Sequence, residues 1–269
     1  MIDKIIYTLF RLFSLSLSLI PRKANIVLGK FFGIAMFCFF PLRKKVARIN
    51  LEIAFPEKTK KEIEKLILKT YKHYGILTFE FIRLYYSKLD QSIVEIDDET
   101  KSLLNHQSGV ILMTAHIGNW EMILSIINTF KNVTAIVRKQ KNSGGDKFFY
   151  ECRNLKNVTL IPNKGSRRKM LNSLKNNEIL LLASDQNAKN HGTIIDFFGK
   201  GASIPKGAGH FYYSTPSIIV VGFCVLKDNL KYEFKLRELK INKNNEQKEN
   251  IIVEVNSIYS KMLEDEIIK

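Results

Sequence analysis

The segment GVILMTAHIGNWE, residues 109–121, runs from an apolar stretch through a polar turn into the start of a second apolar stretch. Its first part, residues 109–115, is rich in Val, Ile, Leu and Met, which predicts a strand buried on both faces. Gly118 permits a tight bend, and Asn119 is a favourable helix N-cap. We therefore expect a strand, a turn that contains His116, and a helix that begins near Asn119.

The same alternation of apolar runs and polar helical stretches continues toward the C-terminus. Short apolar runs bounded by turn residues are typical of buried strands. Strands that alternate with helices predict an α/β fold, with a mainly parallel or mixed central sheet flanked by helices. The other strands are expected at residues 133–137, 158–161, 179–183 and 218–225, with a half-exposed edge strand at 232–237, and helices over 57–88, from about 146, 166 and 205, and up to about 268.

The N-terminal residues contain two apolar runs, and we expect both to contact lipid. Residues 5–20 are interrupted by Arg11 and residues 26–42 by Lys30, whereas a spanning helix needs about 20 predominantly apolar residues. An amphipathic helix with basic residues lies in the interface of an anionic membrane without crossing it. We expect residues 1–45 to form such an uncleaved anchor, monotopic rather than spanning.

Residues 43–45, Arg-Lys-Lys, follow the second run. Basic residues beside an apolar segment are typical of the cytoplasmic side, so we expect residues 46–269 to form a single cytoplasmic α/β domain. A cleavable signal peptide is disfavoured, because Pro21 and the basic residues after it replace the small residues of a cleavage site. Buried core helices of a soluble domain remain the alternative for the first 45 residues.

The chain carries 42 Lys and Arg against 26 Asp and Glu, a formal net charge of +16. Such a surplus favours anionic partners: phosphate groups, anionic lipids or an acidic carrier protein. No nucleic-acid-binding module is legible, and the phosphate-binding and dinucleotide-binding glycine motifs are absent. The three cysteines are far apart and form no C-x-x-C pair, so neither a disulfide framework nor a zinc ribbon is predicted.

Polar side chains follow several of the predicted strands at the point where each strand ends. In an open α/β sheet, ligands bind outside the carboxyl ends of the strands. We therefore expect the candidate site at that edge, lined by His116, Asn119, Glu121, Arg138, Asn142, Asp146, Asp185 and Gln186.

His116 and Glu121 are the expected catalytic pair. Five residues on a helix turn through about 500°, which leaves side chains roughly 140° apart, so the two meet only if His116 lies in the turn and Glu121 in the first turn of the helix. His116 would then donate one ring N–H to Glu121, and its other nitrogen would act as a general base. A histidine that caps the strand, beside an ordinary acidic first-turn residue, is the alternative.

The segment His116–Glu121 (HIGNWE) after an apolar strand resembles the signature of the late acyltransferases of lipid A biosynthesis, within the lipid acyltransferases that share an H-x4-D/E motif. The resemblance extends to the spacing of Arg138, Asn142 and Asp146 and to Asp185-Gln186, followed by Asp-Phe-Phe-Gly at 196–199. It implies a glycerolipid acyltransferase-like fold and spans nearly the whole chain.

The resemblance implies an enzyme at the cytoplasmic face of the bacterial inner membrane. It would move a fatty-acyl chain from acyl carrier protein, or from acyl-CoA, to a hydroxyl of a lipid A precursor, with no metal or cofactor. Glu121 would orient His116, Arg138 would bind the anionic acceptor or the oxyanion, and Asp185 would organise the pocket. No G-x-S-x-G elbow is present, so we expect direct transfer without an acyl-enzyme.

Three alternatives differ in substrate or in class. The same chemistry can act on another glycolipid, a lysophospholipid or an aminolipid. A metal-dependent hydrolase would use the scattered histidines and carboxylates, although no H-E-x-x-H spacing occurs. A non-catalytic basic scaffold would use the net charge alone to bind a membrane or nucleic acid.

Overall fold

A computed structural model describes residues 1–163, 165–241 and 247–269. The chain forms two compact units. The first consists of Met1–Lys88 and Gln140–Cys152, and the second of Leu89–Lys139 and Arg153–Lys269. The expected division after residue 45 stays a prediction about which segment meets a membrane.

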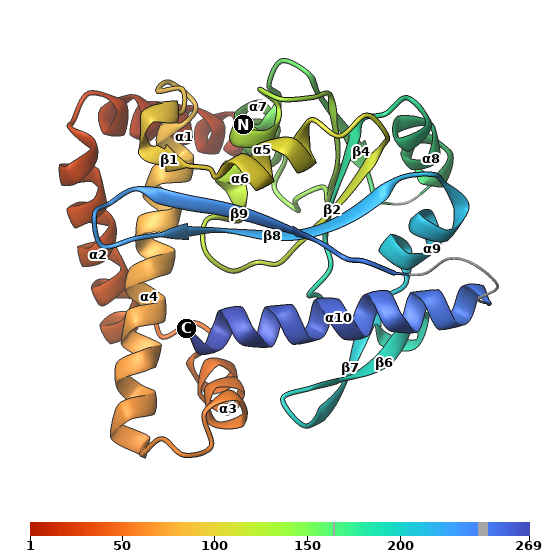
Figure 1. Cartoon of the computed structure of the whole chain (residues 1–269). Coiled ribbons are helices and arrows are strands. Elements are labelled where there is room, and N and C mark those ends of the chain that lie inside the picture. Colours follow the sequence, from red (N-terminus) through yellow and green to blue (C-terminus); the bar gives the residue numbers. More distant parts are fainter. Residues whose placement is uncertain (164, 242–246) are drawn as a thin grey trace. The chain divides into compact units, whose positions relative to one another are not determined.

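The second unit is built on a seven-stranded sheet with the order β1-β9-β8-β2-β5-β3-β4 (Figure 1). Every neighbouring pair is parallel except β8 and β9. The predicted α/β fold with a mainly parallel central sheet is confirmed. The strands are β1 (Val94–Glu95), β2 (Val110–Thr114), β3 (Val133–Val137), β4 (Val158–Pro162), β5 (Ile179–Ala183), β8 (Ile218–Leu226) and β9 (Tyr232–Glu238).

Helices cover both faces of this sheet. Side chains alternate along a strand, and in β2 Ile111 and Met113 belong to one core cluster, whereas Val110 and Leu112 belong to the other. The first cluster includes side chains of α8 (Arg167–Lys175), α9 (Gly207–Ser214) and α10 (Lys248–Ile268), and the second includes those of α5 (Asp98–Leu104) and α6 (Trp120–Ile127). Burial on both faces explains why the strands are almost continuously apolar.

Two features of the second unit differ from expectation. The strand β9 is not an edge, because β8 pairs with one side of it and the two-residue β1 with the other. An antiparallel hairpin of β6 (Gly192–Phe197) and β7 (Lys200–Pro205) forms a separate sheet. Its glycines and scattered polar residues hide the strand pattern.

The first unit is helical. Its helices are α1 (Ile2–Ser18), α2 (Arg22–Phe39), α3 (Lys44–Ala54), α4 (Lys60–Arg83) and most of α7 (Ser143–Arg153). The long helix expected over 57–88 is α4, and a capping box of Thr59 and Glu62 fixes its start. Helices α2 and α4 approach closely at Gly75, where an added Cβ would lie 2.1 Å from the carbonyl oxygen of Gly29.

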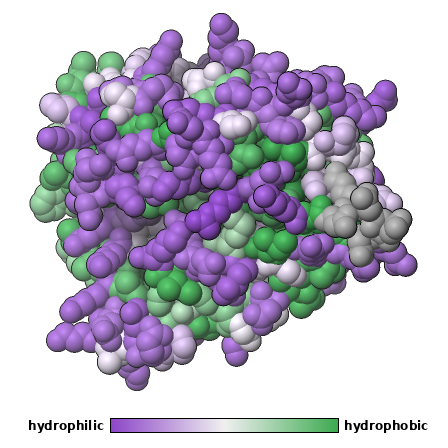
Figure 2. Space-filling model, in the orientation of Figure 1, coloured by the Kyte–Doolittle hydropathy of each residue, from purple (hydrophilic) through white to green (hydrophobic). Residues whose placement is uncertain are grey.

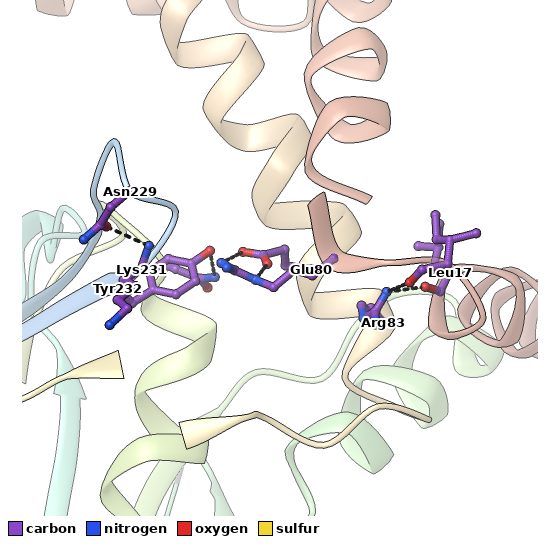
Figure 3. Close-up of polar contacts among 9 residues, drawn as sticks. Leu17, Glu80, Arg83, Asn229, Lys231 and Tyr232 are labelled. Atoms are coloured by element: carbon purple, nitrogen blue, oxygen red, sulfur yellow. Dashed lines mark hydrogen bonds and ion pairs between the residues drawn. The ribbon is translucent and has the colours of Figure 1, made fainter. Parts of the chain in front are cut away.

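A buried ion pair also joins α2 to α4. Arg22 Nε lies 2.6 Å from Glu80 Oε1, and Glu80 is only 3% exposed. One turn further along α4, Arg83 donates to the carbonyl oxygen of Leu17, at 2.6 Å, and to that of Ile20 (Figure 3). These contacts join the end of α1 and the start of α2 to the last turn of α4.

Candidate active site

His116 lies in the turn between β2 and α6, as predicted. Gly118 adopts φ 55°, and a Cβ there would lie 2.1 Å from the carbonyl oxygen of Cys224 in β8. The backbone N–H of Asn119 donates to that same oxygen at 2.6 Å. Only glycine fits such a close approach, so the turn is fixed against the neighbouring strand and His116 is held at the carboxyl end of the sheet.

The imidazole of His116 is held by Asp185. His116 Nδ1 lies 2.8 Å from Asp185 Oδ1, and the backbone N–H of His116 donates to Asp185 Oδ2 at 3.0 Å. The register explains this contact: Thr114 pairs with Ala183, so His116 and Asp185 each stand two residues beyond the end of adjacent parallel strands. One carboxylate therefore fixes both the backbone and the ring of His116.

This arrangement selects the tautomer of the ring. An ionised carboxylate only accepts hydrogen bonds, so Nδ1 carries the proton and Nε2 carries the lone pair. Gln186 Nε2 lies 3.5 Å from His116 Nε2. About one third of the His116 side chain is exposed, so solvent reaches part of the ring.

The surrounding charges favour the protonated imidazole. The hydrogen bond to Asp185 raises the pKa of His116, burial opposes this rise, and the charges of Asp185 and Glu121 add to it. Arg153 acts in the opposite direction. A raised pKa strengthens the ring as a base and stabilises the imidazolium that forms when it takes a proton.

Glu121 lies in the first turn of α6, as predicted, but it is not the carboxylate placed at Nδ1. Arg153 donates from Nε to Glu121 Oε2 at 2.9 Å and from Nη2 to Oε1 at 2.5 Å, and Trp120 Nε1 donates to Oε1 at 3.2 Å. The Trp120 ring in turn lies 5.2 Å from the His116 ring, centroid to centroid. The expected His116–Glu121 hydrogen bond is corrected to His116–Asp185, and Glu121 acts on the imidazole through its charge.

The sequence pattern missed the roles of two residues. Asp185 was placed at the correct edge, but the order of the strands decides that β5 lies beside β2, and no local spacing reveals that order. Arg153 stands 32 residues after Glu121, at the end of α7, and follows no strand. Its signal in the sequence is only that of one basic residue among many.

Asn119 is 1% exposed, and both ends of its amide are used within the fold. Its Oδ1 accepts from the Met122 N–H at 3.3 Å, and its Nδ2 donates to the Tyr232 hydroxyl at 2.9 Å. Lys231, next to Tyr232, donates its N–H to Asn229 (Figure 3). Asn119 is thus the cap of α6, and its expected contact with substrate stays a prediction.

Of the remaining predicted residues, two lie at the carboxyl edge of the sheet. Gln186 follows β5, and Arg138 is exposed directly after β3, which neighbours β5. With strands about 4.8 Å apart, Arg138 stands roughly 10 Å from the end of β2. It is therefore placed to meet a group bound beside His116, and its role in substrate binding stays a prediction.

Asn142 and Asp146 belong to the first unit, where they build the start of α7. Asn142 accepts from the Gly145 N–H at 2.8 Å and donates to Asp3 at 2.7 Å. Asp146 accepts from the Gln140 N–H at 2.7 Å. These contacts are structural, and the expected binding of substrate by both residues stays a prediction. Within the described ranges, no group of three or more His, Cys, Asp and Glu is arranged to hold a metal ion.

Comparison with known proteins identifies a family. A sequence model described as bacterial lipid A biosynthesis acyltransferase matches residues 2–267. Two phosphatidylinositol mannoside acyltransferases are each 22% identical to this chain. The match to the protein of Mycolicibacterium smegmatis (strain ATCC 700084 / mc(2)155) covers 68% of this chain and 62% of that protein. The match to the protein of Mycobacterium tuberculosis (strain CDC 1551 / Oshkosh) covers 58% of this chain and 52% of that protein. The chain thus spans less than two thirds of the length of these relatives.

Proposed function

The chain belongs to the bacterial lipid A biosynthesis acyltransferase family, and we propose that it transfers a fatty-acyl group from acyl carrier protein to a hydroxyl of a lipid A precursor. The observation that carries the proposal is the His116–Asp185 pair at the carboxyl edge of the sheet. It leaves Nε2 as a base that can take a proton from an alcohol, which is what esterification by direct transfer requires.

In this mechanism His116 Nε2 removes the proton of the acceptor hydroxyl. The oxygen attacks the thioester carbonyl carbon and a C–O bond forms. The C–S bond then breaks, and the imidazolium returns the proton to the departing sulfur. Asp185, by contact, and Glu121, by charge, stabilise the imidazolium. The N–H groups at the start of α6 and the Arg138 guanidinium are the donors we assign to the oxyanion.

A second acceptor class has support from the comparisons. The relatives from both mycobacteria are named as acyltransferases of a phosphatidylinositol mannoside. The same base would serve a sugar hydroxyl of such a glycolipid, because general-base catalysis requires only a hydroxyl within reach of Nε2. Acyl-CoA is the corresponding alternative donor.

We further propose that the first unit binds the cytoplasmic face of the bacterial inner membrane. On α1, Ile2, Ile5, Leu9 and Leu12 are all at least half exposed and recur at three- and four-residue steps, which places them on one helical face. Soluble surfaces rarely present such a continuous apolar stripe. In Figure 2, apolar side chains are visible along the margin where Figure 1 places α2.

The anchor is proposed to be monotopic. Within the described residues no single helix has both the length and the apolar character of a span, although α2 and α3 pass the same test as a pair bent by 102°. Basic residues at 43–45 stand at the bend, where anionic headgroups would attract each by about 1 kcal/mol.

The test is transfer of a labelled acyl chain from acyl carrier protein to purified lipid A precursor. His116→Ala should lower kcat/KM by at least about a hundredfold while the protein still folds. Mass spectrometry of lipid from a deletion strain provides the second readout. Loss of one acyl chain from lipid A supports the proposal, whereas loss from a mannosylated phospholipid instead supports the second acceptor. Unchanged lipids would refute both.

A further inference from the structure

Basic residues gather around His210 on the second unit, at the starts of three separate helices. The Arg167 guanidinium, at the start of α8, contacts the imidazole of His210. Lys206 is the N-cap of α9 one turn before His210, whose N–H donates to its carbonyl oxygen at 3.0 Å. Lys248 is the first residue of α10. We call Arg167, Lys206, His210 and Lys248 the α8–α9 basic cluster.

Arg167 and Lys248 lie close enough to His210 for their positive charges to act on its imidazole. Burial lowers the pKa of His210, and the positive charges of Lys248 and Arg167 lower it further, with Glu249 acting weakly against them. Across the described ranges, no ion pair joins Arg167, Lys206 or Lys248 to a carboxylate. A concentration of positive charges that are not neutralised by ion pairs attracts a polyanionic partner.

The cluster lies at the same edge of the sheet as His116. Helix α8 begins after β4 ends, and α9 precedes β8, which runs parallel to β2. Both helices therefore start at the carboxyl ends of the strands. Figure 1 shows α8, α9 and the start of α10 at one end of this unit. The edge strand β4 is three strands from β2, or roughly 14 Å at the usual strand spacing.

We propose that the α8–α9 basic cluster is the docking surface for an acidic acyl carrier protein, which binds there and extends its thioester along the sheet edge to His116. This inference rests on the proposed donor. Arg167 and Lys206 are exposed, and the cluster spans three helices. Such an open surface fits the acidic face of a protein, whose mobile prosthetic arm bridges the remaining distance to His116.

The experiment compares the double variant Arg167→Glu/Lys206→Glu with the wild-type chain. A matched control, Lys156→Glu/Lys175→Glu, makes the same change of charge at two exposed lysines that precede β4 and β5, at the opposite edge of the sheet. Two donors are used: acyl carrier protein, and the same acyl chain on uncharged N-acetylcysteamine. Circular dichroism and Tm establish that each variant folds.

The double variant should lose at least about tenfold in kcat/KM with acyl carrier protein, and the loss should shrink at high salt. With acyl-N-acetylcysteamine it should stay within about twofold of wild type, as should the control with both donors. The docking proposal would be overturned if the double variant kept the wild-type kcat/KM with acyl carrier protein. It would also be overturned if the double variant lost activity equally with both donors, or if only its KM for the lipid acceptor rose.

Direct binding separates this proposal from the proposed function. Fluorescence anisotropy of labelled carrier protein should show weaker binding to the double variant than to the control, whether or not transfer is observed. If wild type binds the carrier through the cluster but transfers no acyl group, the proposed function fails and the docking surface stands. If the double variant binds the labelled carrier as tightly as the control and the wild type do, the docking surface is refuted.

Discussion

Substitution of Asp185 by Asn tests the catalytic geometry most directly. Two N–H donors, the backbone and Nδ1 of His116, face two carboxylate oxygens at 3.0 and 2.8 Å. Asparagine supplies one oxygen and one NH₂ group. If its oxygen accepts from the backbone, its NH₂ faces Nδ1 and favours the tautomer with the proton on Nε2. That tautomer has no lone pair on Nε2 with which to deprotonate a hydroxyl.

Two effects set the size of the loss. A hydrogen bond to a charged group contributes about 1.5–3 kcal/mol, which corresponds to roughly a 10- to 150-fold change in rate. The change of tautomer adds to this, up to the 10² to 10⁴ range of a general base. We therefore expect kcat/KM for Asp185→Asn to fall at least about tenfold and at most about 10⁴-fold.

The pH profile gives the more specific readout. Because Asp185 is the largest cause of the raised pKa of His116, the acid limb of kcat/KM should lie above the ordinary histidine pKa of about 6.5 in wild type and move to lower pH in Asp185→Asn. A raised folded-state pKa stabilises the protein below the unfolded pKa, and this stabilisation is lost as pH rises through the folded value. The Tm difference between the two proteins should thus be larger near about pH 6 than near about pH 9.

An acid limb that does not move would refute this reasoning, even if the rate falls. Such a result would mean that Asp185 orders the turn without acting on the imidazole. Asp228→Asn, on the surface turn after β8, is the control, and it should leave both the rate and the profile unchanged within about twofold.

Four other perturbations test separate parts of the structure. Arg153→Met releases Glu121 and removes the cation that opposes protonation of His116. The acid limb of kcat/KM should therefore move to higher pH, opposite to its movement in Asp185→Asn, and an unchanged acid limb would contradict this prediction. Gly75→Ala should destabilise by about 1–3 kcal/mol in chemical denaturation, because its Cβ would meet Gly29 at 2.1 Å, whereas Gly145→Ala, with no neighbour nearer than 3.6 Å, should be neutral or stabilising. Glu80→Ala leaves Arg22 without its buried partner and should cost about 3 kcal/mol, against at most about 0.5 kcal/mol for exposed Lys101→Ala. Leu9→Asp/Leu12→Asp should reduce binding to anionic vesicles at least about tenfold, since each buried Leu contributes about 1.5–3 kcal/mol, whereas Ile194→Asp on the exposed hairpin should not.

The fold was predictable because its signals are local. The strands β3 and β5 begin and end at the expected residues, and Asn119 caps α6 as its residue type predicts. The antiparallel hairpin was missed because glycine and polar residues interrupt its apolar pattern. The short β1 was missed because two residues show no periodicity.

The candidate site was predictable as a set of strand ends and not as a set of contacts. His116 and Glu121 are near neighbours in sequence, so their spacing suggested a direct bond. The bond that forms instead joins residues 69 positions apart. It depends on the placement of β5 beside β2, a choice made by the packing of the whole sheet, which spacing along one segment cannot report.

The H-x4-E spacing has a physical purpose without a direct bond. One turn into α6, Glu121 is near enough for its charge to raise the pKa of His116, and Arg153 and Trp120 hold its carboxylate in place. Arg153 lowers the same pKa, so the ion pair moderates the effect of Glu121. Asp185, by contrast, sets the tautomer through contact. Two carboxylates thus act on one ring by different routes, and only the contact with Asp185 determines which nitrogen keeps the lone pair.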